Sequence, residues 1–80
     1  MVYYKVKDEK IAVYNYMDEK DFLTFILKGQ AFKVDSFDKD YIKISFCFER
    51  FGEKEVMDGV ITYNQFKYGV VKVEEEEQWK

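Results

Sequence analysis

Apolar and polar residues alternate along several stretches of the chain, most clearly over residues 41–50. In a strand, the two faces of this stretch would carry Ile42, Ile44, Phe46 and Phe48 on one side and Tyr41, Lys43, Ser45, Cys47 and Glu49 on the other. A period of two with one apolar side is typical of a sheet that is buried on one face. We therefore predict residues 41–50 as the central strand of a mostly antiparallel sheet.

Shorter alternating stretches predict further strands at residues 2–7, 11–16 and 31–36. The link 8–10 is short and polar, so the first two strands are expected to form a hairpin. Gly52 follows the central strand and predicts a tight turn there.

Residues 19–28 carry the signals of a helix. Asp18 is a good N-cap because its carboxylate accepts from the free amides of a first helical turn. Gly29 suits the left-handed residue that ends a helix. The apolar residues between them would cover an arc of about 200° on a helix, and the helix is expected to pack on the sheet through Phe22, Phe25 and Ile26. So wide an arc leaves one apolar flank for loops or for another molecule.

The C-terminal half leaves alternatives open. Residues 54–63 read either as a hairpin turning at Asp58-Gly59 or as one long strand with a bulge at Gly59, and the length of 41–50 slightly favours the long strand. Residues 66–74 predict the last strand, although its two ends are out of phase unless Gly69 forms a bulge.

These elements give the order β-β-α-β-β-β-β, an α+β fold with a single helix on a mostly antiparallel sheet. Eighty residues suffice for one domain, which we place at residues 1–73, and an acidic tail at residues 74–80 follows it.

Charge and composition exclude several classes of protein. The chain has 13 basic and 16 acidic residues, a net charge of −3, and four of the acids are the run Glu74–Glu77. Duplex DNA is disfavoured as a partner because DNA-binding domains usually carry a basic patch. No apolar run approaches the length of a membrane span, and the N-terminus has no signal-peptide core, so a cytoplasmic location is expected.

Chemical motifs are absent from the sequence. There is no His, and the single cysteine, Cys47, is expected to be a strand residue that acts as a small hydrophobe. The Ser and Thr residues lie in no nucleophile motif, and no glycine pattern fits a phosphate loop. We therefore expect no enzymatic activity, no cofactor and no metal.

One acidic cluster, Asp35, Asp38 and Asp40, could in principle bind a divalent cation through its carboxylate oxygens. Its spacing does not match a calcium loop, and Lys39 lies inside it. A solvated turn between strands is the favoured interpretation.

Aromatic residues are the main anomaly, because 20% of the chain is Phe, Tyr or Trp and one small core cannot enclose them all. The residues expected at a partner-binding surface are Tyr3, Tyr14, Tyr16, Tyr41, Tyr63 and Tyr68, together with Glu74, Glu75, Glu76, Glu77 and Trp79 of the tail. Tyrosines are enriched at protein interfaces, and an aromatic residue beside an acidic run can act as an anchor.

The resulting hypothesis is a small non-enzymatic protein that binds or inhibits another protein, as compact, acidic, aromatic-rich chains encoded by phages or mobile elements do. The alternative is a single-stranded nucleic-acid binder that uses the repeated Lys–aromatic pairs as a stacking platform. A homodimer is slightly favoured over a monomer, through the apolar flank of the helix or the sheet edges at residues 2–7 and 66–74.

Overall fold

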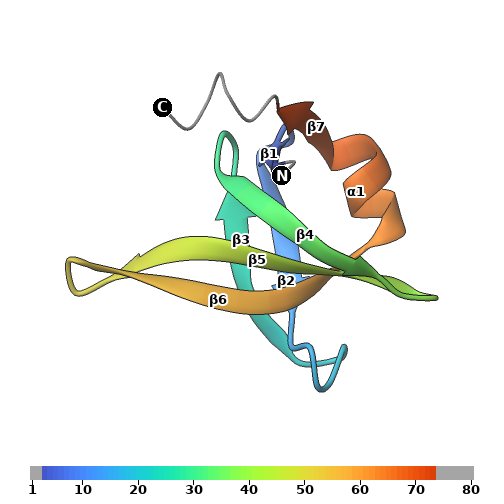
Figure 1. Ribbon diagram of the computed structural model, residues 1–80, viewed down its shortest axis with the longest axis horizontal. Helices are drawn as coiled ribbons and strands as arrows, with labels where there is room; N and C mark the ends of the chain where they lie inside the picture. The colour runs from blue at the N-terminus through green and yellow to red at the C-terminus, as the bar shows by residue number, and fades with distance from the viewer. Residues whose placement is uncertain (1–2, 74–80) are drawn as a thin grey trace.

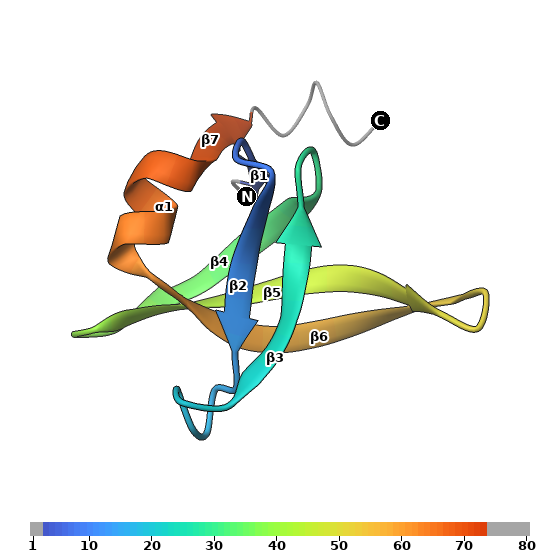
Figure 2. The ribbon, with the colours of Figure 1, turned by 180° about the vertical axis from the view of Figure 1, so that it is seen from behind.

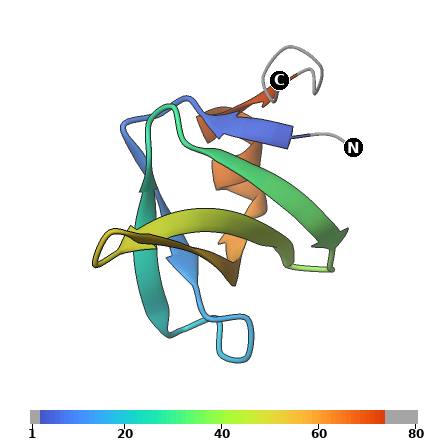
Figure 3. The same ribbon diagram turned by 60° about the vertical axis from the view of Figure 1, so that its left-hand side comes forward.

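The computed structural model describes residues 3–73, apart from the side chain of Arg50 (Figure 1). The elements follow in the order β1 (Tyr3–Val6), β2 (Lys10–Tyr14), β3 (Phe22–Leu27), β4 (Ala31–Phe37), β5 (Tyr41–Arg50), β6 (Glu53–Thr62), α1 (Tyr63–Gly69) and β7 (Val70–Val73). The strands form one antiparallel sheet in the order β3-β2-β6-β5-β4-β1-β7. The sheet curls into a half-barrel, with β2 and β3 crossing the long ribbon of β5 and β6 (Figures 2 and 3).

The core lies on the inner face of the curled sheet. Its buried side chains are Val6, Ile11, Val13, Ile26, Phe32, Ile42, Ile44, Phe46 and Ile61. Three of the four residues predicted to form the apolar face of β5 are in this set, and the fourth, Phe48, is half-buried against it. The prediction for residues 41–50 is confirmed, and β5 is the middle strand of the sheet.

The predicted α+β class is wrong, because residues 19–28 do not form a helix. Phe22–Leu27 is β3, an edge strand paired with β2. Thr24 is half-buried and Ile26 buried on the inner face, while Phe25 and Leu27 are exposed, so the residues alternate with the period of a strand. The apolar arc of about 200° that a helix would show is explained by the strand, because both faces of β3 carry apolar side chains. A lone ten-residue helix is marginal, whereas pairing with β2 satisfies alternate backbone groups of the segment and buries Ile26.

The expected cap and stop residues take other roles. The Asp18 carboxylate accepts from the N–H of Lys20 at 3.1 Å within a loop. Gly29 does have the left-handed conformation, with φ of 87°, but it serves a turn in which the N–H of Gln30 donates to the carbonyl of Leu27 at 2.9 Å. Both residues therefore shape turns on either side of β3.

The helix lies near the C-terminus instead. Residues 66–74 were predicted as one strand, but Tyr63–Gly69 is α1 and only Val70–Val73 is strand, which explains why the two ends of the segment were out of phase. Thr62 and Gln65 form a capping box. Phe66 packs its ring 4.9 Å from that of Tyr4 and 5.7 Å from that of Phe37, so α1 covers one end of the core.

We expect Thr62→Ala to lower the free energy of unfolding by about 1 kcal/mol, because it removes the hydroxyl that accepts from the N–H of Gln65. Thr62→Ser keeps that acceptor and is expected to retain most of the stability. Urea unfolding followed by circular dichroism measures both variants. Equal losses for Ala and Ser would show that the hydroxyl does not cap α1.

The expected pairing of the first two strands is also wrong. Residues 2–7 and 11–16 were predicted as a hairpin, but β1 lies between β4 and β7 and does not pair with β2. The chain bends between them, where the N–H groups of Lys7 and Asp8 donate to the carbonyl of Gly69 at 2.7 and 3.3 Å. Contrary to expectation, β1 is therefore not a sheet edge.

The long-strand interpretation of residues 54–63 is confirmed, since β6 runs unbroken from Glu53 to Thr62 and pairs with β5 in continuous register. The expected bulge at Gly59 is absent. Gly59 is instead the point at which β2 crosses close to β6. The predicted turn at Gly52 is present, with φ of 54° at Phe51 and 80° at Gly52.

Candidate functional site

A cleft of about 400 Å³ lies between the loop that joins β2 to β3 and the turn that joins β4 to β5. We call it the tyrosine cleft, and its lining residues are Tyr16, Met17, Glu19, Asp38, Lys39, Asp40, Tyr41 and Val60. The cleft is shallow and open to solvent, and its volume lies within the range of ligand-binding sites.

The side chain of Asn15 holds one wall of the tyrosine cleft in place. Its Oδ1 accepts from the N–H of Met17 at 2.8 Å, and its Nδ2 donates to the carboxylate of Asp21 at 3.1 Å. The Asn15 N–H also donates to the carbonyl of Asp21 at 2.8 Å, so both ends of the loop are tied together. The loop presents Tyr16 and Met17 to solvent, and 83% of Met17 is exposed.

The opposite wall is tied to both β5 and α1. The N–H of Asp38 donates to the carbonyl of Tyr41 at 2.9 Å and closes the turn. The hydroxyl of Tyr63, the first residue of α1, donates to the carbonyl of Asp38. The turn therefore has contacts from two elements, which fixes Tyr41 opposite the loop of Tyr16.

Acidic side chains outnumber basic ones along the lining of this cleft. Three carboxylates, those of Glu19, Asp38 and Asp40, line it against the single ammonium of Lys39. The ammonium of Lys43 lies 4.0 Å from the centre of the Tyr16 ring, a cation–π contact. The cleft is thus an acidic site in which an aromatic ring already holds a cation.

A second surface of note is the β3 strip, which we define as Phe22, Leu23, Phe25 and Leu27. These side chains are 36–58% exposed on an edge strand. The Phe22 and Phe25 rings lie 4.8 Å apart, and the Lys10 ammonium lies 4.3 Å from the Phe25 ring.

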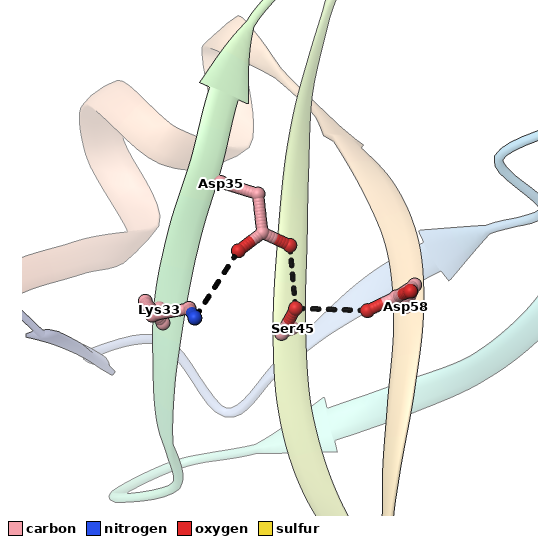
Figure 4. A network of polar contacts seen from close by, with 4 residues as sticks. All are labelled: Lys33, Asp35, Ser45 and Asp58. Carbon is pink, nitrogen blue, oxygen red and sulfur yellow. Dashed lines mark hydrogen bonds and ion pairs between the residues drawn. The ribbon is translucent and has the colours of Figure 1, made fainter.

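A polar network crosses the outer face of the sheet (Figure 4). Lys33 lies 3.6 Å from Asp35, whose carboxylate accepts from the Ser45 hydroxyl at 2.5 Å, and the Ser45 hydroxyl also lies 2.8 Å from the Asp58 carboxylate. A hydroxyl carries one proton, so Ser45 donates to one carboxylate at a time. The network joins β4, β5 and β6, and we interpret it as a cross-strand brace rather than a nucleophile site.

The structure brings only part of the expected tyrosine set together. Tyr16 and Tyr41 face the same cleft, and Tyr63 anchors its turn. Tyr14 lies on β2, with its ring 6.2 Å from that of Phe22 beside the β3 strip. Tyr3 and Tyr68 lie elsewhere, on β1 and α1. The predicted site residues Glu74–Glu77 and Trp79 fall outside the described residues.

The predicted acidic cluster is divided. Asp35 belongs to the brace on β4, whereas Asp38 and Asp40 belong to the cleft. Over residues 3–73, no group of three or more potential ligands is arranged to hold a metal ion. Cys47 lies on β5, on the face predicted to be the wetter one, and it is exposed.

Sequence reasoning missed the β3 strip because it assigned these residues to a helix. The signal was present, since Phe22–Leu27 reads Phe-Leu-Thr-Phe-Ile-Leu, rich in residues that favour strands.

Of the helices the structure describes, none has the length and apolarity needed to cross a membrane. Comparisons with protein-family models, curated protein sequences and solved structures gave no match.

Proposed function

We propose that this chain is a small non-enzymatic domain that binds another protein through the β3 strip. One observation carries the proposal: four of the six residues of β3 are large, apolar and exposed, on a strand at the edge of the sheet. Exposed apolar groups that lie together on a small domain usually mark an interaction site. The mode of binding that fits is addition of an extended segment of the partner to this edge.

The backbone of β3 supports that mode. The N–H of Lys28 donates to the carbonyl of Glu9 on the β2 side at 3.0 Å, and hydrogen-bonding residues alternate along an antiparallel pair. The N–H and carbonyl of Phe25 are therefore directed away from β2, toward the open edge. The N–H of Leu27 is not available to a partner strand, because it donates to the Gln30 side chain in the turn at 3.3 Å. The N–H of Phe25 is the group left for a partner strand, because the Phe25 carbonyl already accepts from the Thr24 hydroxyl at 3.3 Å.

Edge strands usually carry features that discourage pairing, such as lysine, proline or an inward-pointing charge. Within Phe22–Leu27 the sequence contains no charged residue, proline or glycine. The features that discourage pairing here are a register shift between Thr24 and Phe22 and the Lys10 ammonium over the Phe25 ring, which leave most of an apolar edge open to a partner. This supports binding as the role of β3.

Nucleic-acid binding is the competing function. Within residues 3–73, lysines lie over aromatic rings in three places: Lys10 on Phe25, Lys43 on Tyr16 at 4.0 Å and Lys67 on Tyr68 at 5.3 Å. These pairs lie on separate elements, and the first is on the β3 strip itself. A single-strand binder needs consecutive rings along a basic groove, and a net charge of −3 works against one. The protein-binding proposal is therefore favoured. We also propose a cytoplasmic location, because a free cysteine suits a reducing compartment.

The test is capture of a partner from the source organism by the purified chain. We expect one stoichiometric protein to be retained by the wild type and lost by Phe25→Lys, because a buried ammonium at the centre of the edge is costly. Phe51→Lys is the matched control, since it replaces a 98% exposed Phe far from β3 and should retain the partner. Equal retention by both variants, or capture of salt-sensitive nucleic acid instead, would contradict the proposal.

Light scattering over a tenfold concentration range separates two candidate occupants of the edge. A monomer mass throughout means that the partner is a different protein, as we propose. A dimer that Phe25→Lys dissociates and Phe51→Lys does not would identify the occupant as a second copy of this chain.

A further inference from the structure

We infer that the tyrosine cleft binds an arginine side chain presented by a basic segment of a partner protein. The inference deepens the proposed function by naming the chemistry of the partner, and so rests on it, but it concerns a surface separate from the β3 strip. Its basis is the combination of a concave site, aromatic walls and charge complementarity.

Acidic residues outnumber basic ones on the two connections that form the walls of the cleft. The two connections that form its walls, residues 16–21 and 38–40, contain the acids Asp18, Glu19, Asp21, Asp38 and Asp40 and the bases Lys20 and Lys39. Together with Lys43, whose ammonium lies on the Tyr16 ring, five negative and three positive charges leave a local balance of −2. All seven side chains of the two connections are exposed, so their field reaches an approaching ligand.

The aromatic walls suit a cation in particular. Lys43 reaches the ring of Tyr16 from β5 and is not among the residues that line the cleft. Lys43 occupies one face of this ring, so an incoming cation would use the other face or displace the lysine. A guanidinium can stack on a tyrosine and donate hydrogen bonds to a carboxylate at the same time, which makes arginine a better fit than lysine.

The walls are also held before any ligand arrives. Asn15 ties the first wall through the N–H of Met17 and the carboxylate of Asp21, and Tyr63 ties the second through the carbonyl of Asp38. A site whose walls are already ordered loses little conformational entropy on binding. Met17, flexible and 83% exposed, can adapt to the aliphatic part of the ligand.

The experiment is an NMR titration of the ¹⁵N-labelled chain with the peptide acetyl-Gly-Arg-Gly-amide at low salt. We expect amide shifts confined to the two walls of the cleft and weak affinity, with the shifts reduced at high salt. The neutral peptide acetyl-Gly-Gln-Gly-amide is the matched probe and should give no such shifts. Equal shifts from both peptides, or arginine shifts spread over the surface, would overturn the inference.

Variants locate the contacts. Asp40→Asn should weaken arginine binding about threefold, as expected for an exposed ion pair. Tyr16→Leu should weaken it by a similar factor of about three through loss of the cation–π contact. Lys43→Met should strengthen it about twofold, because it removes a competing charge from the Tyr16 ring.

Glu53→Gln is the control, because it removes an exposed carboxylate from the far end of the β5–β6 ribbon and should leave affinity unchanged. A loss equal to that of Asp40→Asn would mean that net charge alone attracts the peptide, against the inference. Phe25→Lys separates the two proposals, since it should abolish partner capture while leaving the location of the arginine shifts in the cleft. Cleft shifts caused by an oligothymidine in place of the peptide would also overturn the inference.

Discussion

Phe32→Ala is expected to lower the free energy of unfolding by about 3–5 kcal/mol, the usual loss when a buried phenylalanine is truncated to alanine. Phe32 is 2% exposed on β4, and its ring lies 5.9 Å from that of Tyr4 on the neighbouring strand β1. It is the largest of the fully buried side chains, so its removal leaves a large cavity at the centre of the sheet. An 80-residue domain has a total stability of about 4–12 kcal/mol. At the lower end of this range the variant is unfolded at room temperature, and at the upper end it stays folded with a lower urea midpoint.

Urea unfolding followed by far-ultraviolet circular dichroism measures this loss. Phe51→Ala is the control, because it removes the same ring from a position that is 98% exposed at the turn between β5 and β6. Phenylalanine and alanine carry the same Cβ at the positive φ of that turn, so backbone strain is similar and stability should change by less than about 0.5 kcal/mol. Similar losses for the two variants would mean that the core does not centre on Phe32.

The elements that were predicted correctly from sequence are those in which local pattern and tertiary environment agree. Along β5, alternation of apolar and polar residues coincides with one buried and one exposed face, and Gly52 supplies a left-handed turn residue. Such agreement leaves few competing conformations. The strand at residues 31–36 was predicted for the same reason.

Residues 19–28 and 63–69 show the opposite case. Residues 19–28 have a good cap in Asp18 but contain β3, whereas residues 63–69 were assigned largely to strands but form α1. The capping box of Thr62 and Gln65 was present in the sequence, at the spacing that marks a helix start. Local signals thus existed for both outcomes. Pairing with β2 favours a strand over a helix for Phe22–Leu27, and packing of Phe66 on Tyr4 favours the helix α1.

The candidate sites were only partly predictable. The preference of tyrosine hydroxyls for water correctly predicts that Tyr16 and Tyr41 lie at the surface. It does not predict that the two residues share a cleft. Their loops are far apart in sequence, and they meet because β2, β6 and β5 are neighbours in the sheet. The predicted hairpin of residues 2–7 and 11–16 would have placed them differently. Long-range strand order is the information that the local pattern lacks.

Gly59→Ala tests that strand order directly. A Cβ at this position would lie 2.4 Å from Cγ1 of Val13 and 3.0 Å from the carbonyl oxygen of Tyr14, both on β2. Val13 is fully buried and branched at Cβ, so it has little freedom to move away. The pairing of Tyr14 with Val60 adjoins the contact and would be pushed apart. We expect the free energy of unfolding to fall by about 1–3 kcal/mol, as for other overpacked cores.

A double-mutant cycle with Val13→Ala shows whether the clash is the cause. Truncating Val13 removes the methyl group that the new Cβ would strike, so the double variant should be more stable than the sum of the two single losses predicts, by about 1 kcal/mol. Val56→Ala on the same strand as Gly59 changes a residue that is 71% exposed and should couple to Gly59→Ala hardly at all. Strictly additive losses for Gly59 and Val13 would mean that β2 does not cross β6 at this point, and the curled sheet that positions both the tyrosine cleft and the β3 strip would then have to be revised.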